Sequence, residues 1–259
     1  MQNNIFSAHS PAQFLIVLDE VGSTNDYLKS KTANFKPLAE WTAIMARNQT
    51  TGRGQRENKW YSEPNVNITF SFLLYPNYIK PQEHFFLNIL VSLSIIQWLS
   101  SLNIQAKIKW PNDIMIGDKK IAGILIENSL SSLEIKKSII GIGINVNQRL
   151  FNDNISKSAS SIYKETDVYI EDLELACKKL VNLLYQNFES FRNKEIEKTQ
   201  LLKNYNSQLF LRDISSLYSS NNEIFKGILK RVEKDGTLIL ENEGLECSYQ
   251  FKEVSFILQ

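Results

Sequence analysis

Residues 106–147 read AKIKWPNDIMIGDKKIAGILIENSLSSLEIKKSIIGIGINVN, and this stretch says most about the architecture of the chain. Three β-type runs rich in isoleucine occur in it, at 106–110, 119–128 and 133–147. The links between these runs contain residues typical of turns, namely Pro111, Asn112, Asp113, Gly117 and Asp118. Strands that follow one another without an intervening helix favour an α+β layout over repeated βαβ units.

The segments on either side alternate between strand and helix patterns. A helix beginning at Ser23 or Thr24 is predicted, because either side chain can cap it. An apolar pattern with helical spacing covers about 83–101. Strands are predicted at 14–20, 42–47 and 66–75, and further helices at 171–190 and 194–206.

Beyond about residue 207 the pattern changes to short strands. They are predicted at 223–232, 237–242 and 247–258, and an Asp235-Gly236 pair between two of them is a strong hairpin signal. We therefore predict two domains, a larger α+β domain over 1–206 and a small β-barrel over 207–259.

Composition excludes several classes of function. With 43% hydrophobic residues the 259-residue chain can build a sizeable core, and its net charge of +1 argues against a bulk electrostatic grip on nucleic acid. His9 and His84 are isolated, so a histidine metal site or a Ser-His-Asp triad has little material. Cys177 and Cys247 lie far apart, so we expect buried reduced thiols rather than a disulfide framework.

The N-terminus lacks the charged start and apolar core of a signal peptide. The longest apolar stretch, 85–99, is too short for a membrane span and contains Asn88 and Gln97, so it is predicted to be a buried helix. We expect a cytoplasmic protein without membrane contact.

Four segments place polar groups and glycines at the ends of apolar strands: 23–25, 49–60, 109–124 and 141–147. Each has a purely structural interpretation. Ser23-Thr24-Asn25 can be only a helix cap, the basic loop around Arg53 only a surface turn, and 110–113 only a turn. Glycines at 141 and 143 indicate either a bulge or a close approach of another group.

Taken together, the four segments resemble the motifs of biotin–protein ligases. The loop GRGQRENKW (52–60) and the strings KWPNDI, KIAGILIE and GIGINVN match that family in order and separation, and the resemblance runs from about residue 14 to the end. It implies a class II synthetase-like mixed sheet with flanking helices, followed by a small SH3-like β-barrel.

The resemblance implies a two-step reaction. The biotin carboxylate attacks the α-phosphate of ATP, and a lysine of a biotin carboxyl carrier protein domain of a carboxylase then attacks the resulting biotinyl-5′-AMP. Two anions must meet, so Arg53 and Lys120 are the expected catalytic residues, and both are expected to line one cavity. ATP and Mg²⁺ are the implied cofactors, and relatives that dimerise through their central sheets make a homodimer possible.

The family match assigns the remaining side chains of the site. The expected biotin-binding residues are Ser23, Thr24, Asn25, Gln49, Arg53, Gly54, Gln55, Lys120 and Gly123. The expected nucleotide-binding residues are Arg56, Trp60, Lys109, Asn112, Asp113, Asn145 and Arg149. Among these, Asp113 and Asn145 are expected to hold Mg²⁺ through oxygen atoms.

Two features depart from the family pattern. Gln55 stands where many members carry a second arginine, which can weaken retention of the adenylate unless Arg56 and Lys59 compensate. Some members carry a helix-turn-helix domain before the catalytic one, whereas about a dozen residues precede the first predicted strand here. We therefore expect a monofunctional ligase that does not bind DNA.

Two alternatives stay open. A lipoate–protein or octanoate–protein ligase uses the same adenylate chemistry, although its arginine–serine–triple-glycine signature is absent from the sequence. A non-enzymatic interaction module would release no pyrophosphate with biotin and ATP.

Overall fold

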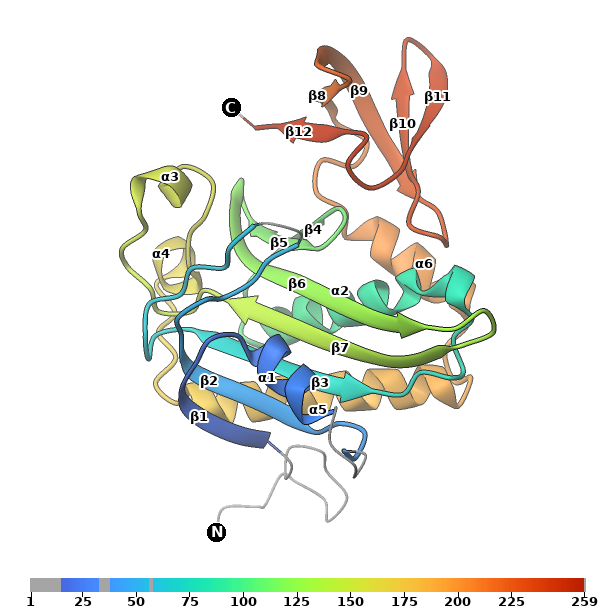
Figure 1. Ribbon diagram of the computed structural model, residues 1–259. Coiled ribbons are helices and arrows are strands. Elements are labelled where there is room, and N and C mark those ends of the chain that lie inside the picture. Colours follow the sequence, from blue (N-terminus) through green and yellow to red (C-terminus); the bar gives the residue numbers. More distant parts are fainter. Residues whose placement is uncertain (1–14, 33–37, 56–57, 259) are drawn as a thin grey trace.

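The computed structural model describes residues 15–32, 38–55 and 58–258 of the chain. Two sheets organise it, a seven-stranded mixed sheet flanked by helices and a separate five-stranded antiparallel sheet (Figure 1). The predicted α+β class is confirmed.

The larger sheet has the strand order β1-β2-β3-β7-β6-β5-β4. Only the β1–β2 pair is parallel, and the other five pairs are antiparallel. The strands are β1 (Leu15–Val21), β2 (Ala43–Gln49), β3 (Ile68–Leu74), β4 (Lys107–Lys109), β5 (Asp113–Ile116), β6 (Lys119–Leu130) and β7 (Ile135–Ile144).

Helices cover both faces of this sheet, as Figure 1 shows. α1 (Thr24–Lys31) lies on one face, where Leu28 packs against Ile44 of β2 and Ile139 of β7. The opposite face packs against α2 (Phe85–Ser101) and α5 (Leu173–Arg192). The remaining helices are a short 3-10 turn (Pro81–Glu83), α3 (Asp153–Ser156), α4 (Ile162–Thr166) and α6 (Lys198–Ser207).

α2 is a core helix. Within the described part of the chain, Pro81–Ser101 is the one helical segment long and apolar enough to cross a membrane, yet 67% of its most apolar window is buried inside the protein. A helix that is apolar all round needs partners on every side. Contacts with α5, α6 and β6 supply them, so the prediction of a buried helix is confirmed.

The second sheet has the order β11-β10-β9-β8-β12 and confirms the predicted C-terminal β unit. Its strands are β8 (Ser215–Ser220), β9 (Glu223–Val232), β10 (Leu238–Asn242), β11 (Leu245–Tyr249) and β12 (Ser255–Ile257). The β9–β10 turn docks on the larger unit, because the indole Nε1 of Trp110 donates a 2.9 Å hydrogen bond to the carbonyl of Gly236.

Several element predictions needed correction. The segment 111–118 was predicted only as turns, but Asp113–Ile116 forms β5 because it pairs with β6. The run 247–258 was predicted as a single strand, but a turn at 250–254 divides it into β11 and β12. The division at 206/207 stays a prediction; α6 ends at Ser207 and β8 begins at Ser215.

Candidate functional site

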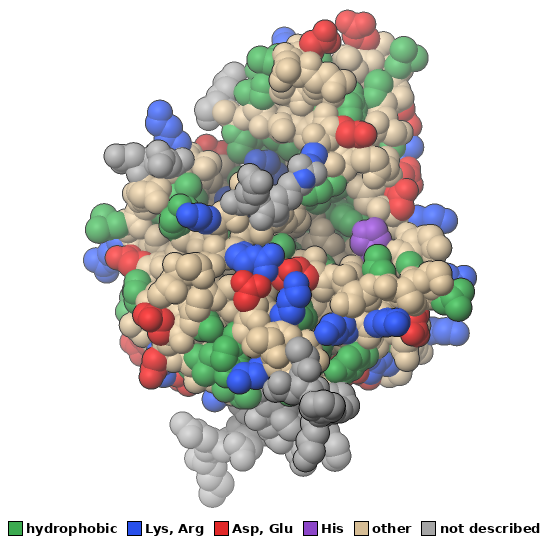
Figure 2. All heavy atoms as spheres, viewed as in Figure 1, with side chains coloured by type: hydrophobic (Ala, Val, Ile, Leu, Met, Phe, Trp, Pro, Cys, Tyr) green, Lys and Arg blue, Asp and Glu red, His purple; other side chains and the backbone are tan. Residues whose placement is uncertain are grey.

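A cleft of about 400 Å³ lies where the two units meet. Its walls come from the start of α1, the 52–60 hairpin, strands β6 and β7, and the turn between β11 and β12. Figure 2 shows basic side chains near this junction of the larger lower part and the smaller upper part.

Three glycines on neighbouring strands form the floor of the cleft. Gly123 of β6 pairs directly with Gly143 of β7, and Gly141 lies two residues before Gly143. A Cβ atom on Gly143 would collide with the indole of Trp60, and one on Gly141 would collide with the amide of Asn25. These glycines therefore serve close approach rather than a bulge, and the groups that approach are side chains of the protein itself.

The start of α1 contributes a buried polar wall. Ser23 caps the helix by accepting a hydrogen bond from the backbone of Asp26, as predicted. Thr24 donates through both its backbone N–H (2.8 Å) and its hydroxyl (3.0 Å) to Oε1 of Gln49. Ser71 of β3 lies 2.6 Å from both the Thr24 hydroxyl and Oδ1 of Asn25. The residues predicted as a helix cap thus also line the cleft.

The basic loop is a hairpin that folds over the sheet. Arg53 and Lys59 form an antiparallel bridge, Gly54 N–H donates to Asn58 O at 2.7 Å, and Trp60 N–H donates to Gly52 O at 2.9 Å. This pairing seats the Trp60 ring on the glycine floor. Its indole Nε1 is buried and has no hydrogen-bond partner among the described residues.

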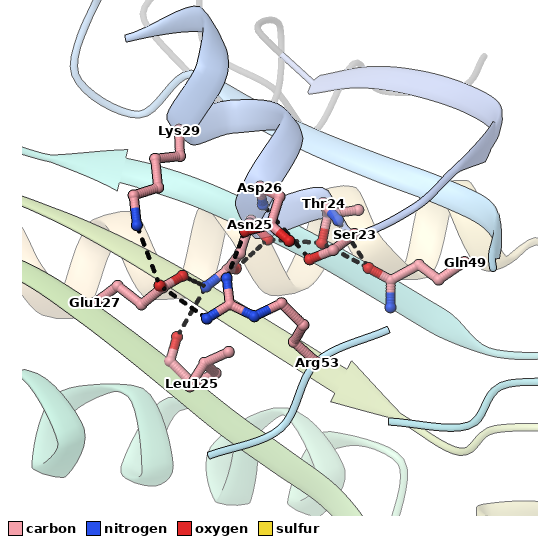
Figure 3. A network of polar contacts seen from close by, with 10 residues as sticks. Ser23, Thr24, Asn25, Asp26, Lys29, Gln49, Arg53, Leu125 and Glu127 are labelled. Atoms are coloured by element: carbon pink, nitrogen blue, oxygen red, sulfur yellow. Dashed lines mark hydrogen bonds and ion pairs between the residues drawn. The ribbon is translucent and has the colours of Figure 1, made fainter. Parts of the chain in front are cut away.

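Arg53 points toward acidic groups, as Figure 3 shows. Its guanidinium pairs with Asp26 of α1 and, at 3.2 Å, with Glu127 of β6. Burial lowers the pKa of Arg53, but the nearby carboxylates of Glu127 and Asp26 outweigh that effect and raise it above its ordinary value. Arg53 is therefore a fixed, permanently charged group in this conformation.

Lys120 and Lys109 provide cations at the other end of the cleft. The Lys120 ammonium lies 2.6 Å from the Asp113 carboxylate and 5.7 Å from the centre of the Trp60 ring. Burial lowers the pKa of Lys109, while Asp113 opposes this shift and Lys120 adds to it. Asn112 donates to the carbonyl of Ile124 at 2.7 Å, so its amide also joins the β5 turn to β6.

The cleft is strongly cationic. Its described lining residues include five cations and a single carboxylate, that of Asp113; the cations are Arg53, Lys59, Lys109, Lys120 and Lys252. Such a concentration of positive charge favours an anionic ligand, and lysine and arginine suit phosphate and carboxylate oxygens.

Most of the predicted site residues line this cleft. They are Ser23, Thr24, Asn25, Gln49, Arg53, Gly54, Gln55, Trp60, Lys109, Asn112, Asp113, Lys120 and Gly123. Two do not: Asn145 is buried and donates to Ser160 O, and Arg149 stacks on Tyr163 at 4.7 Å. Arg56 lies outside the described residues.

The predicted pairing of Asp113 with Asn145 around Mg²⁺ stays a prediction. The described residues contain no cluster of three or more acidic, histidine or cysteine side chains that would hold a metal ion. Oδ1 of Asn145 is buried and has no hydrogen-bond partner among the described residues, and Asn145 does not line the cleft, whereas Asp113 does.

Sequence reasoning missed the C-terminal wall of the cleft. It comes from the turn after β11 and from β12, through Phe251, Lys252, Val254, Ser255 and Phe256. Phe251 meets the Trp110 ring edge to face at 6.1 Å, and the Lys109 ammonium lies 5.5 Å from the centre of the Phe256 ring. The one available signal was the charged Lys252-Glu253 pair, which interrupts the alternation of apolar and polar residues in 247–258.

Comparison with known proteins identifies the same family that the sequence motifs resemble. Residues 17–145 match the model of the biotin/lipoate A/B protein ligase family. The chain is 37% identical over 153 residues to the bifunctional ligase/repressor BirA of Bacillus spizizenii, covering 58% of the chain and 46% of that protein. It is 30% identical over 241 residues to BirA of Bacillus subtilis, covering 92% of the chain and 72% of that protein.

A solved structure extends the likeness to three dimensions. It is the biotin protein ligase of Aquifex aeolicus in complex with biotin and ATP, with a TM-score of 0.77 and 28% identity. The match covers 95% of this chain and 99% of that one, so both sheets take part in it.

Proposed function

The chain belongs to the biotin/lipoate A/B protein ligase family, and from this premise we propose that it is an ATP-dependent biotin–protein ligase. The observation that carries the proposal is the cationic cleft, whose lining includes five lysine and arginine side chains and one carboxylate beside a buried polar wall. An acid and a nucleotide can meet there.

In the first step, a carboxylate oxygen of biotin attacks the α-phosphorus of ATP. The new O–P bond makes the product an acyl phosphate, and pyrophosphate leaves with the electron pair of the broken P–O bond. Negative charge accumulates on the phosphate oxygens, and fixed cations stabilise it most when they need not reorganise. Lys120, held by Asp113 and the Trp60 ring, is such a cation, and Lys109 is a second.

In the second step, the neutral amine of an acceptor lysine attacks the acyl carbon of biotinyl-5′-AMP. An amide forms, AMP leaves, and the amine gives up one proton. Neither step needs a protein nucleophile. The contribution of this chain is to bring two reactants together in line, an effect worth up to roughly 7–11 kcal/mol in favourable cases.

The polar wall suits the ureido ring of biotin. We assign the ring to the end of the cleft bounded by Ser23, Thr24, Asn25 and Gln49, where buried donors and acceptors are fixed by hydrogen bonds among themselves. A ligand must present polar groups that fit these fixed donors and acceptors, which is a basis for selectivity.

The nucleotide is assigned to the end bounded by Trp60, Lys109 and Asp113. Mg²⁺ bound to the ATP phosphates would neutralise part of their charge, and Asp113 is the side chain we assign to it.

The acceptor is proposed to be a biotin carboxyl carrier protein domain. A lipoate or octanoate ligase is the weaker hypothesis, because several relatives and the solved structure of similar fold are named for biotin. Cytoplasmic location, a homodimer and the absence of DNA binding stay predictions.

The decisive experiment is mass spectrometry of a carrier domain after incubation with the protein, Mg-ATP and biotin. We expect the mass of one biotinyl group on one lysine, and no product when lipoate replaces biotin. Lys120→Met should lower the rate of biotin-dependent pyrophosphate release about 100- to 1,000-fold, as loss of one fixed stabilising group does elsewhere. Lys119→Met is the matched control, because Lys119 pairs with Asp118 and does not line the cleft.

Lipoate transfer without biotin transfer would assign the protein to the other branch of the family. No transfer and no pyrophosphate release with either acid would refute the proposal.

A further inference from the structure

Glu127 lies at the meeting point of three elements that surround the cleft, although it does not itself line the cleft. It projects from β6 toward α1 and the 52–60 hairpin (Figure 3). Its two oxygen atoms have different partners. Oε2 accepts a 2.9 Å hydrogen bond from Nδ2 of Asn25, whereas Oε1 accepts one of 3.2 Å from Nη2 of Arg53.

These contacts fix the orientation of two groups assigned to the biotin site. Oδ1 of Asn25 accepts from Ser71, so its Nδ2 faces other acceptors, which are Glu127 at 2.9 Å and, more weakly, the Leu125 carbonyl at 3.5 Å. Arg53 is held from two sides, by Asp26 of α1 and by Glu127 of β6. The hairpin is therefore tied to the sheet through one carboxylate.

The pairing also changes what Arg53 can do. Two carboxylates, Asp26 and Glu127, face Arg53, with Lys29 3.6 Å from Glu127, so the positive charge of Arg53 is largely balanced before any ligand arrives. Attraction of an anion into the cleft then falls to lysines such as Lys109 and Lys120. For Arg53, orientation matters more than free charge.

We propose that Glu127 is a positioning residue for the ligase reaction, which sets Asn25 and Arg53 in the geometry that receives biotin. The inference rests on the proposed function. Asp26 assists from a more exposed position, since its side chain is 49% exposed and that of Glu127 only 21%. Exposed ion pairs contribute little, so Glu127 carries most of the effect.

The direct test is Glu127→Gln, which keeps the shape but leaves one acceptor oxygen for two donors. We expect the Kd for biotin, measured by calorimetry, to rise about tenfold, equivalent to about 1.4 kcal/mol. KM for biotin should rise similarly while kcat changes less than about threefold, because binding is lost equally from the ground and transition states. Limited trypsin digestion should cut after Arg53 faster than in the wild type.

Three further variants separate positioning from general damage. Asp26→Asn should raise the Kd less than about threefold, as expected for an exposed pair. Glu127→Asp keeps both oxygens and should recover part of the affinity. Glu246→Gln, the matched control, removes a surface carboxylate paired with Arg231 on the C-terminal sheet and should leave biotin binding unchanged.

A double-variant cycle tests whether Glu127 acts through Arg53, and Glu127→Asp takes the place of Glu127→Gln in this cycle if the latter is too unstable to assay. If Glu127 acts through Arg53, then Arg53→Gln and Glu127→Gln together should weaken biotin binding by less than the product of their separate effects. Multiplicative effects, or a wild-type Kd in Glu127→Gln, would overturn the inference. Absence of biotin-dependent pyrophosphate release from the wild type would instead refute the proposed function, so the two failures are distinguishable.

Discussion

At the level of single residues, the site depends on positions that carry no side chain. Gly143 pairs with both Gly123 of β6 and Thr69 of β3, so its backbone is held from both sides and cannot yield. In Gly143→Ala the Trp60 ring would have to move instead. We expect destabilisation of about 1–3 kcal/mol, as for other overpacked sites, together with weaker ATP binding, because Trp60 bounds the nucleotide end of the cleft. Urea denaturation and calorimetry measure the two effects.

A compensating change provides the control. Trp60→Phe replaces the indole by a smaller ring, so Gly143→Ala should lose less stability in that background than in the wild type. Equal losses in both backgrounds would show that Trp60 does not rest on Gly143.

The sequence pattern predicted many of the residues that line the cleft, but not the contacts that hold them in place. Ser23-Thr24-Asn25 and Lys120 were found because polar groups at the ends of apolar strands are conspicuous in a sequence. The close approach of Asn25 to Gly141 was not foreseeable, because it joins residues 116 positions apart. The role of Asn145 stays a prediction, and the bond from its amide Nδ2 to the Ser160 carbonyl was likewise not foreseeable from the sequence.

At the level of elements, local periodicity predicted helices and long strands well. It failed where distant pairing decides the outcome. β5 contains only four residues and lies between residues typical of turns. It forms because Asp113 pairs with Gly123 of the neighbouring strand β6. β11 and β12 separate because the 250–254 turn carries the chain from one edge of its sheet to the other.

The contact between α6 and β9 is testable at the same scale. Asn206 of α6 donates to Val232 O at 3.0 Å and accepts from Val232 N at 2.7 Å. Asn206→Ala leaves the backbone N–H and C=O of Val232 without their partner. The expected loss of folding stability is about 1–3 kcal/mol per unsatisfied buried group. We expect the urea midpoint to fall, with no change in the ratio of the KM values for biotin and ATP.

Asn206→Asp discriminates between the two bonds, because it keeps the acceptor and removes the donor. It should lie between wild type and Asn206→Ala in stability. If Asn206→Ala is as stable as the wild type, the side chain does not fasten α6 to the C-terminal sheet.

At the level of the whole molecule, the cleft belongs to both units. The C-terminal sheet supplies Phe251 against Trp110, Phe256 beneath Lys109, and the cation of Lys252. Lys252 has a backbone φ of 83°, a left-handed conformation that residues other than glycine, asparagine and aspartate seldom adopt. An unfavourable backbone angle at the wall of a site points to a functional reason for the residue placed there.

If Lys252 adds to the charge that holds ATP, its removal should weaken ATP use and spare biotin. Lys252→Asn removes the ammonium while tolerating the left-handed angle, so KM for ATP should rise about two- to fivefold, the range for an exposed ionic contact. Lys252→Arg should stay near the wild type. Lys226→Asn, which removes an exposed lysine of β9 outside the cleft, is the control. Steady-state pyrophosphate release decides: equal KM values for ATP in Lys252→Asn and Lys226→Asn would mean that the C-terminal unit contributes its rings to the cleft but not its charge.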